Sequence, residues 1–239
     1  MKRIVILIAC FTTMLAISAG GATSAFALPE FVSKSNPDPL VATGGKMTLV
    51  SGSALTVVCE DSRTTGVIVL PMLVSVDTNF LLCHSTILGT RFPCTTAGAP
   101  SELILTSLLH GLLGYIKKGG EAGKEVGLLL SPTSPTTVLM TFTCKASGIE
   151  HKIVVSGAMI GQLTPINVSA VPYALTFKAE PAGSAKQGIQ TFELLSGLPT
   201  PLFMEKVHLT ASIDGGAPLE TSREDTDTMI TRDESEIKA

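Results

Sequence analysis

The sequence predicts an all-β fold, an antiparallel β-sandwich or barrel-like sheet tied by disulfides. Short segments in which apolar and polar residues alternate recur along most of the 239 residues. The 22 Gly and 14 Pro punctuate these segments, and no convincing series of long helices interrupts them. Many short strands separated by turn residues are typical of sandwiches and barrels.

The first 27 residues have the features of a signal peptide. Lys2 and Arg3 precede an apolar run over 4–19, and Ala25-Phe26-Ala27 has the small-x-small pattern of a cleavage site. We therefore expect cleavage before Leu28 and a secreted, extracellular product. An uncleaved membrane anchor is the alternative, but glycines and the cleavage site follow the run directly, without a cationic flank.

A second alternative is lipid attachment at Cys10, because Leu7-Ile8-Ala9-Cys10 has the residue types of a bacterial lipid-attachment box. Cleavage there would leave too short an apolar segment before it. We interpret Cys10 as an ordinary signal-peptide residue.

Three further regions follow the predicted signal. Residues 28–45 are rich in Pro and Gly, which predicts an extended N-terminal segment without regular structure through most of its length. Residues 46–213 form the predicted β-rich domain. Residues 214–239 carry eight acids and three bases, which indicates a solvated acidic C-terminal tail that could add a final strand.

Within the β-rich domain the clearest strand is Val207–Ile213, whose end is marked by the turn residues Asp214-Gly215-Gly216. Pro71 interrupts Gly66–Val76, so that segment is an edge strand, a bulge or two short strands. The other predicted strands are Met47–Val50, Ala54–Cys59, Thr137–Cys144, Ile153–Ile160, Ala174–Lys178 and Ile189–Leu195.

Residues 101–116 are ambiguous. Leucines and isoleucines at i, i+4 spacing favour one short buried helix, whereas Gly111 and Gly114 would each cost such a helix about 1 kcal/mol. The glycines lead us to favour strands.

Four cysteines remain after the predicted signal, and an even number in an exported protein indicates disulfides. Three pairings are possible. Cys59 and Cys144 are both in phase with the apolar face of a strand, which favours a bridge between them through the core and a second bridge from Cys83 to Cys94. A zinc site with His84 is disfavoured because the cysteine spacing is wrong for that metal.

Several segments resemble a family of exported actinobacterial hypothetical proteins of unknown function. The resemblance covers most of residues 100–180, and its segments include Gly111–Ile116, Lys124–Leu130, Phe142–Cys144 and Gly157–Gly161. It extends to Leu28–Phe31, Thr164–Asn167 and Leu175–Lys178. It implies a secreted, β-rich product that contains disulfides, and it implies no activity.

Composition excludes some function classes. Loss of Lys2 and Arg3 with the signal changes the net charge from −3 to −5, and the region 28–213 is neutral. Such a chain has no basic surface for nucleic acid. The absence of Trp, with only two Tyr, argues against a stacking platform for sugars and against stable membrane insertion after signal cleavage.

No motif predicts catalysis, a cofactor or a metal. A G-x-S-x-G segment is absent, and the four histidines are far apart in sequence. His84, near Asp77 and beside Ser85, is the best candidate base, whereas His208 is expected on a solvated strand face and His110 in an apolar stretch. The acids of the tail lack a calcium-loop pattern.

We therefore expect a non-enzymatic exported β domain that binds an unknown extracellular or cell-envelope partner, or serves a structural role. The alternative is a secreted hydrolase whose catalytic site is assembled only by folding.

Overall fold

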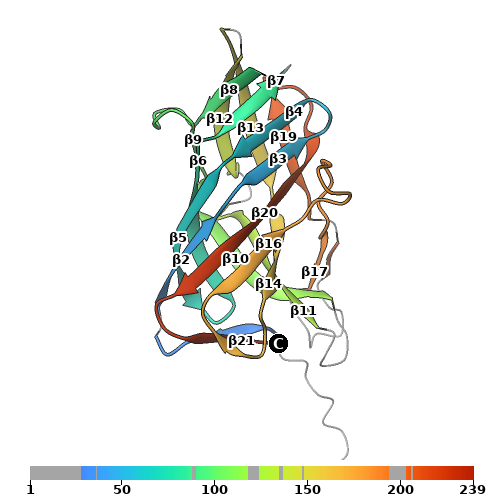
Figure 1. The fold of residues 1–239 in the computed structure, drawn as a ribbon. Coiled ribbons are helices and arrows are strands. Elements are labelled where there is room, and N and C mark those ends of the chain that lie inside the picture. The colour runs from blue at the N-terminus through green and yellow to red at the C-terminus, as the bar shows by residue number, and fades with distance from the viewer. Residues whose placement is uncertain are drawn as a thin grey trace, which may run out of the picture.

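The computed structural model describes residues 28–35, 37–87, 90–117, 124–134, 137–146, 148–193, 203–205 and 207–239. The predicted signal peptide, 1–27, lies outside these residues. The described chain contains strands and no helix, so the all-β prediction is confirmed (Figure 1).

The strands form one closed eight-stranded antiparallel barrel with extra strands. The chain runs up and down as eight long segments, most of them interrupted once near the middle of the barrel. In order they are β2 (Asp38–Gly44) with β3 (Met47–Ser51); β4 (Leu55–Cys59) with β5 (Asp61–Leu70); β6 (Leu73–Leu81) with β7 (His84–Ile87); β8 (Thr90–Thr95), β9 (Leu103–Leu105) and β10 (Leu109–Lys117); β11 (Glu125–Pro132) with β12 (Met140–Ala146); β13 (Ile149–Gly157) with β14 (Met159–Thr164); β16 (Tyr173–Phe177) with β19 (Leu209–Ile213); and β20 (Leu219–Thr231).

The strand β20 closes the barrel. Met229, in its second half, lies opposite Ala42 of β2 and Tyr173 of β16. The first half of β20 pairs antiparallel with β3 on one side and with β19 on the other. A solvated tail over 214–239 is therefore wrong for this segment, and the final strand that the prediction left open is present as the longest strand of the described chain.

The expectation of an irregular segment over 28–45 is also wrong for much of its length. Strand β2 covers seven of these residues and pairs on both sides, with β5 and with β20. Pro39 is accommodated at the second position of the strand, near its start. The segment forms a strand because its side chains alternate between the two faces of the sheet, and Asp38, Leu40 and Ala42 face inward and are buried.

A small three-stranded sheet lies across the lower end of the barrel as drawn in Figure 1. It consists of β1 (Glu30–Val32), β21 (Ser235–Lys238) and β15 (Ser169–Ala170). Phe31 lies opposite Ile237, and both are buried in the main core. The hydroxyl of Tyr173 donates to the carbonyl oxygen of Ser235 and so joins this sheet to the barrel wall. The lower mouth is therefore closed.

Between β16 and β19 the chain leaves the wall and crosses its outer face, forming β17 (Thr191–Glu193) and β18 (Phe203–Glu205). Phe192 is buried there against Leu129, Ile160 and Val207, in a second and smaller apolar cluster. Gly114 permits this approach, because a Cβ at that position would lie 2.4 Å from the carbonyl oxygen of Glu193.

Residues 101–116 form β9 and β10, which confirms the preference for strands and shows that the helix alternative is wrong. Pro71 separates two strands, β5 and β6, at a tight turn, one of the three outcomes considered. Asp214 and Gly215 form the predicted reversal after β19, with φ of 51° and 75°. The amide of Gly216 donates to the carbonyl oxygen of Ile213 across it at 2.9 Å.

The four cysteines that follow the predicted signal are all in disulfides, as predicted, but the predicted partners are wrong. The bridges join Cys59 to Cys83 and Cys94 to Cys144. All four cysteine side chains are buried, so the alternation of inward and outward residues could not identify which cysteines are bridged to each other. Strand adjacency selects them, because Cys94 lies directly opposite Cys144 whereas β4 and β12 are separated around the barrel by β7 and β8.

Candidate functional site

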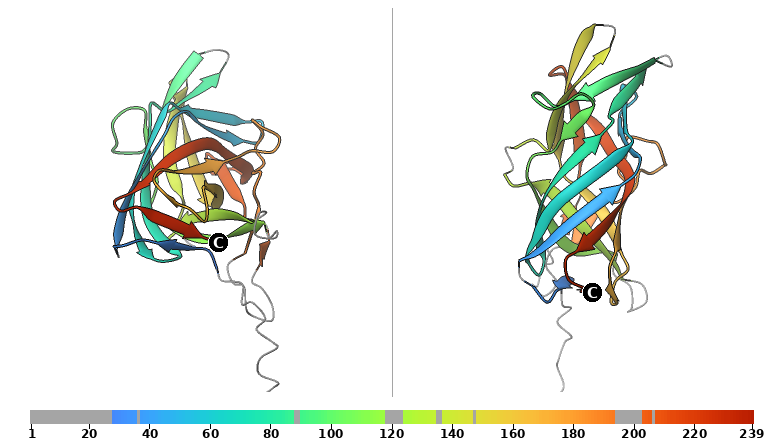
Figure 2. Two further views of the ribbon diagram at one scale, coloured as in Figure 1. Left: turned by 60° about the horizontal axis from the view of Figure 1, so that its bottom comes forward. Right: turned by 60° about the vertical axis from the view of Figure 1, so that its left-hand side comes forward.

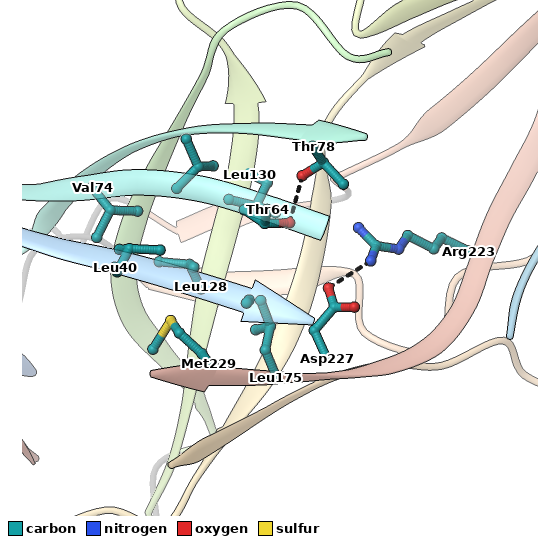
Figure 3. Close-up of a pocket in the computed structure, with 12 residues that line it drawn as sticks. Leu40, Thr64, Val74, Thr78, Leu128, Leu130, Leu175, Arg223, Asp227 and Met229 are labelled. Carbon is teal, nitrogen blue, oxygen red and sulfur yellow. Dashed lines mark hydrogen bonds and ion pairs between the residues drawn. The ribbon is translucent and has the colours of Figure 1, made fainter. Parts of the chain in front are cut away.

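The lower part of the barrel interior is almost completely filled by side chains. A cavity of about 20 Å³, little more than one water molecule needs, remains between apolar residues that include Leu40, Leu128, Leu175 and Met229. Figure 3 shows these side chains converging from opposite strands, with Arg223 and Asp227 at one end. The interior of an eight-stranded barrel is either filled by side chains or holds one small ligand, and in this part of the barrel side chains fill it.

A buried ionic cluster lies beside this cavity, on the inward face of β20. The guanidinium of Arg223 donates to Asp225 at 2.8 and 2.6 Å and to Asp227 at 2.7 Å. It also lies over the rings of Phe177 and Phe80, at 4.0 and 5.1 Å from their centroids. The hydroxyl of Ser62 donates to Asp227 at 2.8 Å.

Burial acts on these charges in opposing ways. Desolvation raises the pKa of Asp225, although the Coulombic attraction of Arg223 and its hydrogen bonds lower it. Desolvation alone would lower the pKa of Arg223, but the two carboxylates outweigh it and raise that pKa. The cluster is enclosed and satisfied, so we assign it a structural role.

The upper end of the barrel, in contrast, is hollow. A cup of about 380 Å³ lies there, within the range of small-molecule sites. Its residues come from the β3–β4 turn and from the strands β4, β7, β8, β12, β13 and β19. The inward apolar lining consists of Leu55, Phe92, Cys144, Ala146, Ile153 and Ile213.

The two disulfides lie side by side in the barrel wall, because the amide of Cys94 donates to the carbonyl oxygen of Cys83 at 2.9 Å. Cys144, bridged to Cys94, belongs to the lining of the cup, and the Cys59–Cys83 bridge joins the adjacent wall segments at the end of β4. The cross-links tie together the successive wall strands β4, β7, β8 and β12 beside the cup.

Two polar groups stand out on the cup. Ser85 is buried on β7, and His151 borders the cup from β13 with 41% of its side chain exposed. The Nδ1 atom of His151 lies 2.8 Å from the Oδ2 atom of Asp214, in the β19–β20 turn. The hydrogen bonds from His151 and from the backbone of Lys152 lower the pKa of Asp214.

The structure does not join the three residues considered for a base. His84 and Ser85 face opposite sides of β7, because successive side chains of a strand alternate. The Nδ1 atom of His84 is 3.3 Å from the carbonyl oxygen of Leu82, and Asp77 accepts from Thr65 at 3.2 Å. In the part of the chain that is described, no serine hydroxyl is hydrogen-bonded to a histidine ring.

The remaining histidines and the aromatic residues near the barrel ends are placed as follows. His208 is exposed, as expected, and His110 is half-buried on β10. Tyr115 and Tyr173 are both buried, and Phe92 lines the cup. Among the residues described, no three acids, histidines or cysteines cluster as metal ligands do.

A groove of about 620 Å³ crosses the outer wall beside β20. Three of its charged groups are engaged locally. Glu224 accepts from the amide of Gly183 at 3.0 Å, Lys178 donates to Gln162 at 3.4 Å, and Asp225 accepts from Arg223.

Sequence reasoning did not find the cup or the His151–Asp214 pair. The two residues are 63 positions apart and meet only because β13 pairs with β19. The signal that could have led to Asp214 was its position at the turn after the clearest strand.

The described residues include no helix with the length and apolarity needed to cross a membrane. No protein-family model, curated protein or solved structure matches this chain.

Proposed function

We propose that this protein is an exported, non-enzymatic binding protein that holds a small apolar molecule in the cup at the upper end of the barrel. The observation that carries the proposal is the difference between the two ends. The lower mouth is closed by β1, β21 and β15, whereas the upper mouth opens into about 380 Å³ lined by apolar side chains.

Export is supported by two features. Residues 1–27 resemble a cleavable signal. The two disulfides are consistent with an oxidising extracellular environment. Under this proposal the bridges are structural and cross-link the wall beside the cup.

The test is saturable binding of N-phenyl-1-naphthylamine, a neutral apolar fluorophore, to the oxidised protein. We expect one site, and we expect Ala146→Trp to weaken binding by roughly tenfold or more, because Ala146 faces the cup and an indole would occupy its space. Ala97→Trp, at an exposed loop residue, is the matched control and should bind as the unmodified protein does.

Leu55→Asn is a second variant in case the indole prevents folding, since it makes the half-buried wall of the cup polar without filling it. It should weaken binding while the protein unfolds cooperatively. Absence of saturable binding, or equal affinity in Ala146→Trp, Leu55→Asn and Ala97→Trp, would show that the cup is not the site.

The alternative of a secreted hydrolase has one feature in its favour, the sharing of the cup by Ser85 and the His151–Asp214 pair. A fluorophosphonate label should leave the protein unmodified under our proposal. Labelling that Ser85→Ala abolishes would instead establish a nucleophilic serine.

A further inference from the structure

The imidazole of His151 is the best-defined polar group at the mouth of the cup. It belongs to the inward face of β13, two residues before the buried Ile153. The neighbouring Lys152 is exposed and, by strand alternation, faces the outside of the barrel. The ring therefore borders the space in which a ligand would lie.

Asp214 fixes which edge of this ring is available. Its Oδ2 atom contacts Nδ1 of His151 at 2.8 Å, and its Oδ1 atom accepts from the amide of Lys152, also at 2.8 Å. Its own amide donates to the carbonyl oxygen of Lys152 at 2.8 Å. A turn with two left-handed residues, Asp214 and Gly215, holds the carboxylate in this place.

The protonation of the pair follows from these contacts. The hydrogen bonds that Asp214 receives lower its pKa, so the carboxylate is ionised and can only accept. The Nδ1 atom of His151 must then carry the hydrogen of that bond. In a neutral imidazole the other nitrogen, Nε2, is an acceptor, and no described residue is hydrogen-bonded to it.

The surroundings disfavour a charged ligand head. Lys145 and Glu150, on the hairpin that carries His151, pair with each other at 3.3 Å. The walls of the cup are largely apolar, and burial of an unpaired charge against such walls is costly. An anion would find no free cation among these groups.

Building on the proposed function, we propose that the ligand is a neutral apolar alcohol or phenol whose hydroxyl donates to Nε2 of His151. The apolar body occupies the cup, and His151 selects for the hydroxyl. Asp214 is a positioning residue, because it acts by holding the tautomer and the orientation of the ring.

The experiment compares two probes of similar shape, 2-naphthol and 2-methylnaphthalene, as competitors of N-phenyl-1-naphthylamine at about pH 8, where an ordinary imidazole is neutral. We expect the unmodified protein to prefer 2-naphthol by roughly three- to tenfold, the value of one neutral hydrogen bond. His151→Leu should lose this preference and still bind 2-methylnaphthalene. His208→Leu, at an exposed histidine, is the control and should keep the preference.

Asp214→Ala separates positioning from simple stability. It should reduce the preference for 2-naphthol while leaving the affinity for 2-methylnaphthalene unchanged, which a merely structural role would not do. Equal affinity for both probes in the unmodified protein, or an unchanged preference in His151→Leu, would overturn this inference and leave cup binding intact. Failure of both competitors to displace the fluorophore would count against the proposed function as well.

Discussion

At the scale of single residues, the inward face of β20 is the least expected feature. Arg223, Asp225 and Asp227 occupy positions at which a barrel strand would ordinarily place apolar side chains. They are tolerated because each charge is neutralised or hydrogen-bonded by another, and because two phenyl rings flank the guanidinium. Such a cluster is vulnerable to loss of one member.

Arg223→Met should therefore lower the free energy of unfolding by about 3 kcal/mol or more, because it leaves two carboxylates buried without their cation. Urea denaturation measures this change. Arg63→Met is the matched control, since Arg63 forms a 3.9 Å pair with Asp61 on the surface and should contribute less than about 1 kcal/mol.

The cause can be checked in the same protein. Addition of Asp225→Asn and Asp227→Asn to Arg223→Met removes the orphaned charges and should recover part of the lost stability. Equal stability of Arg223→Met and Arg63→Met would contradict a buried, desolvated cluster.

At the scale of elements, β20 shows why a strand can be concealed in a sequence. Its inward positions include Thr221, Asp225 and Asp227, and its outward positions include Glu224 and Thr228. Both faces are polar, so the usual alternation of apolar and polar residues is lost. Pairing with four other strands decides its conformation.

Thr228→Pro should accordingly destabilise the protein by about 3 kcal/mol, because Thr228 lies opposite both Thr43 of β2 and Ala174 of β16 and proline cannot donate to either ladder. Thermal or urea unfolding gives the measurement. Thr228→Ala is the control that keeps the backbone amide, and it should remain close to the unmodified protein. A solvated tail would tolerate both substitutions equally.

At the scale of the whole molecule, the two ends of the barrel differ, because a small sheet closes one end and the other end opens into the cup. Figure 2 shows the barrel from two further sides, with the C-terminus at the end where β21 lies. A single core cluster extends from Phe31 and Ile237 at that closed end to the four cysteines of the disulfides. Each disulfide joins neighbouring segments of the wall, so together they limit the separation of these segments beside the cup.

Peptide mapping without reduction, on protein recovered from the culture medium, tests the compartment and the cross-links together. We expect a first residue of Leu28 and peptides that link Cys59 with Cys83 and Cys94 with Cys144. A retained Met1 with free thiols at Cys59, Cys83, Cys94 and Cys144 would contradict export.

The sequence alone determined the fold class and the fate of the cysteines. Alternation in segments such as Val207–Ile213 depends only on local chemistry, and the reversal at Asp214 and Gly215 depends on residues that tolerate positive φ. The burial of Cys59 and Cys144 also followed from their phase within strands, whereas Cys83 lies between two strands.

Only the tertiary structure decided the disulfide partners, the role of β20 and the existence of the cup. Each depends on which strands are neighbours around a closed barrel, and neighbours such as β13 and β19 are separated by dozens of residues in sequence. An inward-facing residue is predictable from a period of two, but the residue it meets across the interior is set by closure of the sheet.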